Sequence, residues 1–178
     1  MTKTSKRSPR NHTYTNAERK KAYGMKKTPL TISGESLPKG KNSESEKKRQ
    51  EILSKIYSKR VADEKARIVY CPSLGSNVLF TNKTSTRETK HRSSGDWKST
   101  ALAIDIERLF DVAEILYVES AKNNKSQSSF SSMVVLIAAV KGYGYAKIIV
   151  GKYRDANAEV PYCQYCVMSV SLRKLKNK

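Results

Sequence analysis

The sequence predicts an α+β fold in which an antiparallel β-sheet packs against one main helix. Two apolar runs, Met133–Val140 and Tyr145–Val150, flank the glycine-containing segment Lys141–Gly144. Glycine supplies the positive φ of a tight reversal, so these runs predict a β-hairpin. Within Asp96–Ser120, apolar residues recur at helical spacing and predict the packing helix. Separate groups of strands and helices are typical of the α+β class.

Further strands are predicted on both sides of this helix. The run Pro161–Leu172 follows a polar loop and makes a three-stranded meander with the hairpin. Upstream, Arg67–Cys71 and Asn77–Thr81 are short apolar runs joined by residues with turn chemistry, which predicts a second hairpin. The core domain is therefore expected to span residues 67–172.

The chain outside this core is strongly basic. Residues 1–43 combine Lys, Arg, Ser and Pro and are predicted to be disordered. Residues 44–66 predict a basic amphipathic helix, with Ser43 as its N-cap and Ile52 and Ile56 in a narrow apolar stripe. This helix either packs weakly on the core as a solvated helix or lies along phosphates. Residues 173–178 form a basic C-terminal tail.

Charge is distributed unevenly along the chain, whose net charge is +19. Residues 1–67 carry 19 Lys and Arg against 7 Asp and Glu, whereas residues 68–172 carry 12 against 9. Basic ends on a nearly neutral core favour a polyanion as partner, which can be RNA, DNA or an anionic membrane surface. The alternative is that the tails only increase solubility. No apolar run reaches the length of a membrane span and no signal peptide is seen, so we expect a cytoplasmic protein without a membrane partner.

Signatures of cofactor and metal sites are weak in this sequence, and no cofactor is expected. Cys163 and Cys166 form a C-x-x-C pair, and only Cys71 and His91 could complete a zinc site. Residues three apart on a strand face opposite sides, which favours structural thiols in a reducing compartment over zinc.

The connector at residues 82–95 holds the candidate catalytic residues. A carboxylate and an imidazole can act as base and acid, so Glu88 is the candidate base and His91 the candidate acid. Neighbouring cations can hold a phosphate, and the candidates for this role are Arg87, Lys90 and Arg92. The alternative is an ordinary exposed basic loop that happens to include one histidine.

The order of these elements resembles a known group. The chain resembles the barnase/RelE-like ribonuclease fold of phage and mobile-element polyproteins, the large polyvalent protein-associated domains. The resemblance lies within residues 67–172, in the segments IVYCPSLGSNVLFT, TRETKH and GYGYAKIIVGKYRD…PYCQYCVMSV. This resemblance implies metal-free RNA cleavage, with Tyr145, Lys147, Tyr153 and Arg154 on strands that face RNA. The core lacks the second histidine of some relatives, because His12 lies in the tail.

The first function predicted is therefore a nucleic-acid-directed protein of phage or mobile-element type, acting as a metal-independent endoribonuclease. The alternatives are a non-enzymatic nucleic-acid-binding accessory protein and a scaffold that binds a protein partner. A ribonuclease would cut RNA in the presence of a chelator, whereas a binder or a scaffold would not.

Overall fold

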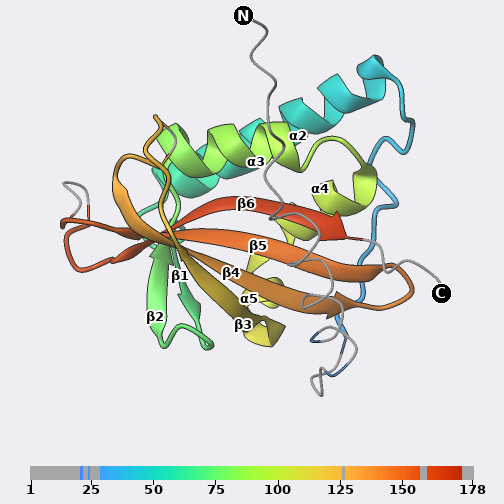
Figure 1. Ribbon diagram of the computed structural model, residues 1–178. Helices are drawn as coiled ribbons and strands as arrows, with labels where there is room; N and C mark the ends of the chain where they lie inside the picture. Colours follow the sequence, from blue (N-terminus) through green and yellow to red (C-terminus); the bar gives the residue numbers. More distant parts are fainter. Residues whose placement is uncertain (1–20, 22–23, 25–28, 126, 157–159, 174–178) are drawn as a thin grey trace, which may run out of the picture.

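The computed structural model describes residues 21, 24, 29–125, 127–156 and 160–173. Its centre is a six-stranded sheet with the strand order β1-β2-β6-β5-β4-β3 (Figure 1). The strands are β1 (Ile68–Cys71), β2 (Ser76–Leu79), β3 (Glu114–Ser120), β4 (Phe130–Val140), β5 (Gly144–Tyr153) and β6 (Tyr165–Arg173). The helices are α2 (Ser43–Ala62), the π-helix η1 (Asn82–Thr86), α3 (Arg87–Arg92), α4 (Trp97–Ile104) and α5 (Ile106–Val112). The predicted α+β class is confirmed.

The predicted hairpins and the C-terminal meander are present. β1 pairs with β2 through a turn in which Gly75 has a φ of 59°, and β4 pairs with β5 through a turn in which Gly142 has a φ of 79°. β5 continues the meander by pairing antiparallel with β6. Glycine at both turns provides the left-handed backbone that a tight reversal requires.

The sheet is mixed, so the predicted purely antiparallel arrangement is wrong at one junction. β2 and β6 run parallel, and their register pairs Val78 with Tyr165 and Leu79 with Cys166. This pairing joins the first hairpin to the last strand of the chain. A parallel pair needs a long crossover connection, so no turn signal in the intervening sequence reveals it.

The predicted Asp96–Ser120 helix is also wrong in its second half. Asp96 caps α4, since its Oδ1 accepts a hydrogen bond from Ser99 N at 2.8 Å. The helical region breaks at Asp105, resumes as α5 and ends before Ala113, whose backbone is extended. The following residues form β3, which is paired antiparallel with β4. β3 contains Ile, Tyr and Val, which favour a strand once a partner strand is available.

The main core lies between one face of the sheet and the helices. Its members include Phe80, Leu102, Phe110 and Leu136, all fully buried. The sheet curls strongly, and α5 contacts both β1 and β4 (Figure 1). The opposite face carries a smaller buried cluster of Phe130, Met133, Cys166 and Met168. β4 is buried on both faces at residues 133–138, which explains its continuous apolar sequence.

Helix α2 packs against η1, α3 and α4 on the side of the sheet that carries the main core (Figure 1). Its N-cap is Asn42 rather than the predicted Ser43, because Asn42 Oδ1 accepts from Ser45 N at 2.9 Å. The buried side chains of α2 are Arg49, Leu53 and Tyr57, while Ile52 and Ile56 are half-buried. None of the described helices is long and apolar enough to cross a membrane.

The segment before α2 is part of the folded body, so the predicted disorder is wrong for residues 29–42. Leu30 forms a parallel bridge with Val140, with two backbone hydrogen bonds of 2.9 Å to Ala139 and Lys141. Lys21 Nζ donates a hydrogen bond to a backbone carbonyl of β3. Apart from Lys21 and Gly24, the predicted tail at residues 1–28 lies outside the described residues, as does the C-terminal tail after Arg173.

Candidate nucleic-acid interface

Serine side chains fix the candidate catalytic segment against the edge of β6. β2 pairs with only the first two residues of β6, and beyond them the edge is completed by side chains. Ser85 Oγ donates to the Val167 carbonyl at 2.6 Å, and Ser93 Oγ donates to the Val170 carbonyl. Ser99 Oγ accepts from the Leu172 amide at 2.9 Å. The serines substitute for a neighbouring strand and hold η1, α3 and α4 in place.

The connector, which was predicted to be a loop or a loop with one helical turn, is helical over residues 82–92. η1 is a π-helix that leads directly into α3, and Thr81 caps it by accepting from Thr84 N at 3.2 Å. π-helical turns are rare and often lie at functional sites. The five candidate residues of this region all lie on the short helix α3. They are Arg87, Glu88, Lys90, His91 and Arg92.

Glu88 is held between two guanidinium groups. Its carboxylate lies 3.2 Å from an Arg87 nitrogen and 3.3 Å from Arg92 Nε. The Glu88 side chain is 15% exposed, whereas those of Arg87 and Arg92 are 46% and 62% exposed. The structure therefore brings together the predicted base and two of the predicted phosphate ligands. The Glu88 carboxylate accepts a hydrogen bond from each of the two guanidinium groups.

His91 is exposed on α3, three residues after Glu88. Side chains at this spacing lie on the same face of a helix. In the described part of the chain, however, no hydrogen bond joins the two side chains. Lys90 is half-buried on the same helix. α3 thus gathers the predicted acid, base and cations without forming a hydrogen-bonded catalytic pair.

The predicted residues of β5 do not join this group. The main core takes Ala146, Ile148 and Val150, so alternation places Lys147 on the opposite face of the sheet. Tyr153 packs against Phe130 with a centroid separation of 5.0 Å. Lys147 and Arg154 are about 23 Å apart along an extended strand, so one phosphate cannot contact both.

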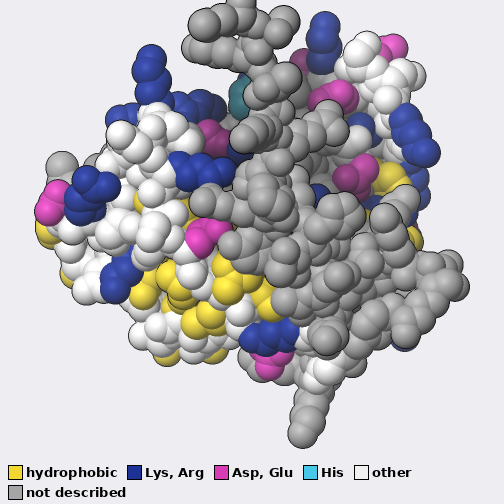
Figure 2. All heavy atoms as spheres, in the orientation of Figure 1, with side chains coloured by type: hydrophobic (Ala, Val, Ile, Leu, Met, Phe, Trp, Pro, Cys, Tyr) yellow, Lys and Arg dark blue, Asp and Glu magenta, His cyan; other side chains and the backbone are white. Residues whose placement is uncertain are grey.

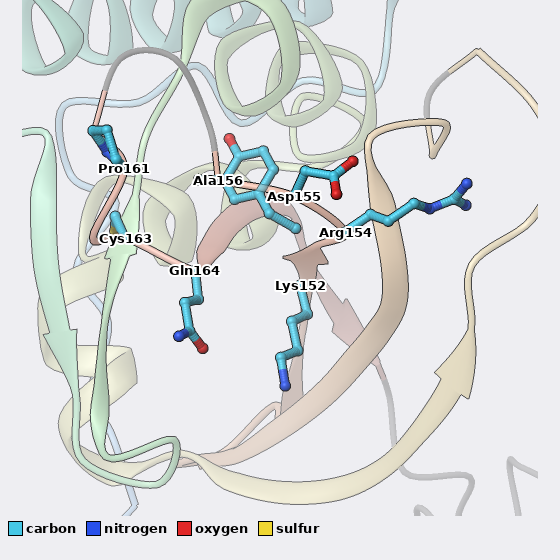
Figure 3. Close-up of a pocket in the computed structure, with 8 residues that line it drawn as sticks. Lys152, Arg154, Asp155, Ala156, Pro161, Cys163 and Gln164 are labelled. Carbon is cyan, nitrogen blue, oxygen red and sulfur yellow. The ribbon is translucent and has the colours of Figure 1, made fainter.

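A cavity of about 350 Å³ lies at the end of β5 (Figure 3). Lys152 and Gln164 extend from it in one direction, while Arg154 and Asp155 point away from them. Burial raises the pKa of the Cys163 thiol above its ordinary value, so this thiol stays protonated at neutral pH. The full set of lining residues is Lys152, Tyr153, Arg154, Asp155, Ala156, Pro161, Cys163 and Gln164.

All three cysteines are buried, and the C-x-x-C pair is divided between two apolar clusters. Cys163 packs with Leu79 and Val160, whereas Cys166 packs with Phe130, Met133 and Met168. Cys163 precedes β6, so the strand alternation that was expected to separate the two side chains does not apply to this pair. Within the described ranges, no group of three or more His, Cys, Asp or Glu side chains is arranged to hold a metal ion.

A cluster of lysines and aromatic rings, which was not predicted from the sequence, lies at the end of the sheet where β4 turns into β5. We name it the aromatic–lysine pocket and define it by Lys39, Lys41, Trp97, Lys98 and Tyr143. Trp97 and Tyr143 meet edge to face, with centroids 5.9 Å apart and an interplanar angle of 85°. Lys39 Nζ lies 5.0 Å from the Trp97 ring centroid, and Lys98 Nζ lies 4.6 Å from that of Tyr143.

The adjoining cavity of about 330 Å³ is lined by Lys39, Gly40, Lys41, Gly95, Asp96, Trp97, Lys98 and Leu172. These residues come from the segment before α2, the start of α4 and the end of β6. Because these residues are far apart in sequence, the sequence alone does not show that they form one pocket. Only Trp97 and Lys98 are neighbours in the sequence. The segment before α2 approaches closely because Gly34 lies against the indole, where a Cβ would be 2.2 Å from a Trp97 ring carbon.

Comparison with known proteins gives no relative: no family model, curated protein or solved structure matches this chain. The resemblance to the barnase/RelE-like ribonuclease fold therefore stays a prediction.

Proposed function

We propose that this protein binds nucleic acid, with RNA as the preferred polymer, through its excess of cationic side chains. The observation that carries the proposal is the net charge of +19, most of which lies in the basic N-terminal part of the sequence. A charge of this size favours association with a polyanion and supplies the counterion release that drives binding to phosphates.

The described surface supports contacts spread over a polymer. α3 carries Arg87, Lys90 and Arg92 against a single carboxylate, Glu88. Figure 2 shows Lys and Arg side chains at several separate places on the visible part of this face. Separated cations suit successive phosphates of a backbone better than one small anion.

A second candidate function is metal-independent RNA cleavage, as expected from the resemblance to mobile-element ribonucleases. It is favoured by the position of Glu88 and His91 on the same helix, where the two could act on one phosphate. Binding is favoured over cleavage because the Glu88 carboxylate is engaged with Arg87 and Arg92, and no hydrogen bond joins it to His91 in the described part of the chain. We therefore place binding first. The third alternative, a scaffold for a protein partner, needs no affinity for nucleic acid.

Fluorescence anisotropy with labelled RNA and DNA, in EDTA and over a range of salt concentrations, tests the proposal. We expect affinity to fall steeply as salt rises, with log Kd linear in log salt, because each phosphate contact releases counterions. RNA should bind more tightly than DNA of the same sequence. Absence of binding to either polymer at low salt would overturn the proposal and favour the scaffold.

Gel analysis of the same samples separates binding from cleavage. We expect intact RNA. If fragments appear in EDTA, the second candidate requires that His91→Ala abolish them while affinity is retained. His12→Ala is the matched control, since His12 and His91 are the only two histidines in the sequence. Fragments that survive His91→Ala would exclude the proposed acid.

A further inference from the structure

The aromatic–lysine pocket combines two features that a single-stranded nucleic acid requires. Its aromatic rings offer flat apolar surfaces, and its ammonium groups lie close beside them. Lys98 Nζ is 4.6 Å from the Tyr143 centroid and 5.8 Å from the Trp97 centroid. Base stacking on aromatic rings, together with cations that follow the backbone, is the general mode of single-strand recognition.

We propose that the aromatic–lysine pocket binds an unpaired nucleotide of a single-stranded nucleic acid, with the base stacked in the Trp97–Tyr143 corner and the phosphate beside the lysines. This inference rests on the proposed function and assigns it a specific site. Within a duplex, bases are already stacked on one another and cannot enter such a corner. The pocket therefore distinguishes single strands from duplexes.

The corner is rigid on one side and open on the other. Trp97 is half-buried and packs on Gly34, whereas Tyr143 is 37% exposed at the tip of the β4–β5 turn. A rigid ring provides a preorganised surface, so less conformational entropy is lost when a base stacks on it. Tyr143 lies between two glycines with positive φ, so its side chain can adjust to the base.

The lysines now beside the rings become available to phosphate when a base enters. A cation–π contact at an exposed site is weaker than base–aromatic stacking, so a base can displace the ammonium group from the ring face. Lys39 and Lys41 are exposed, and Lys98 is half-buried. Asp96, the carboxylate that lines the cavity, accepts hydrogen bonds from Ser99 N at 2.8 Å and Ser99 Oγ at 2.7 Å, so it is engaged in capping α4.

The charge and shape of the pocket favour a nucleotide over an acidic peptide. An acidic peptide would use the lysines but would leave the edge-to-face aromatic corner without a partner. Three lysines and one aspartate line the cavity, whose volume of about 330 Å³ suits a single nucleotide unit. A single nucleotide unit is therefore the occupant that uses all of these features.

Titration of the full chain, monitored by intrinsic fluorescence, tests this assignment directly. Trp97 is the only tryptophan in the sequence, so its emission reports on the pocket alone. We expect a short single-stranded RNA to quench Trp97 strongly, whereas the same sequence in a duplex, inorganic phosphate and poly-glutamate leave the emission nearly unchanged. Equal quenching by poly-glutamate would overturn the assignment in favour of an acidic peptide.

Two substitutions make the test specific. Tyr143→Ala should weaken single-strand binding about tenfold and leave duplex binding unchanged, because it removes one stacking surface. Tyr162→Ala is the matched control, since Tyr162 is 71% exposed in the loop before β6. Lys39→Gln should weaken single-strand binding. It should change the Trp97 emission of the unbound protein only slightly. Unfolding curves confirm that each variant is folded.

The outcomes separate this inference from the proposed function. If single strands and duplexes bind with equal affinity and neither quenches Trp97, the pocket assignment is wrong while nucleic-acid binding stands. If neither polymer binds at low salt, the proposed function fails and the pocket assignment fails with it. If Tyr143→Ala and Tyr162→Ala bind single strands equally well, stacking on Tyr143 is excluded.

Discussion

At the scale of single residues, the buried arginine of α2 is the least expected feature. Arg49 is 1% exposed. It donates hydrogen bonds to the backbone carbonyls of Pro38, Gly40 and Ser94 at 2.7–2.8 Å, with a longer contact of 3.5 Å to Gly95. No carboxylate in the described part of the chain pairs with it. One guanidinium group thereby joins the segment before α2 to the segment before α4, and these two segments bring the lysines of the aromatic–lysine pocket together.

We expect Arg49→Met to lower the free energy of unfolding by about 3 kcal/mol, because the buried carbonyls lose their donors. Chemical denaturation with urea measures this change. The matched control is Lys48→Met, since Lys48 is exposed and has only the surface ion pair with Glu44 at 3.3 Å. That variant should change stability by less than about 0.5 kcal/mol. Equal stability of the two variants would show that the carbonyls find other donors.

At the scale of secondary-structure elements, the edge of β6 depends on side chains rather than on a strand. Ser93 is fully buried, and its hydroxyl donates to the Val170 carbonyl. β2 ends its pairing with β6 at Cys166, so it supplies no donor as far along the strand as Val170. Serines of η1, α4 and the end of α3 therefore protect an edge that would otherwise be open to association.

We expect Ser93→Ala to destabilise the fold by about 1–3 kcal/mol, since it leaves a buried acceptor unsatisfied. Thermal or urea unfolding monitors the effect. Ser131→Ala is the control, because Ser131 is exposed on β4 and makes only a long contact of 3.4 Å to the Lys152 carbonyl. A loss of stability no larger than that of the control would contradict the structural role of the serine.

The accuracy of sequence-based prediction also varies between elements. The hairpins were predictable because turn glycines and strand residues are neighbours in sequence, as at Gly142 and Gly75. Glu114–Ser120 was assigned wrongly to a helix because Leu116 continues the helical spacing of Leu109 and Ala113. Pairing with β4, which lies beyond the intervening loop, decided in favour of a strand.

The candidate sites were also predictable only where their residues are close together in sequence. Arg87, Glu88 and His91 were predictable as a group because they are close together in sequence, and α3 keeps them together. The aromatic–lysine pocket was not predictable, because its parts come from three distant segments joined through Arg49 and the Leu30–Val140 bridge. Non-local pairing of this kind has no signature in one sequence.

At the scale of the whole molecule, the excess charge sets the strength and salt dependence of binding. We expect the simultaneous substitution of Lys6, Arg7 and Arg10 by Gln to reduce the slope of log affinity against log salt by about 2, at about 0.7 for each phosphate contact on a single strand. Affinity at low salt should fall, while the unfolding midpoint stays unchanged.

The control for this variant changes the same part of the tail without removing charge. Substitution of Thr4, Ser5 and Ser8 by Gln leaves the net charge of +19 intact and should preserve the slope. A slope that the charge-removing variant leaves unaltered would mean that the substituted cations make no phosphate contacts.

The strand order has a consequence for how the protein is made on the ribosome. β6, residues 165–173, is synthesised after every other strand, yet it takes an interior position between β2 and β5. Contacts such as Val78 with Tyr165 join residues that leave the exit tunnel far apart in time. The nascent chain therefore carries two half-sheets with bare edges until β6 emerges. A premature stop shortly before β6 would release a polypeptide with two unpaired strand edges, and we expect this polypeptide to aggregate or be degraded.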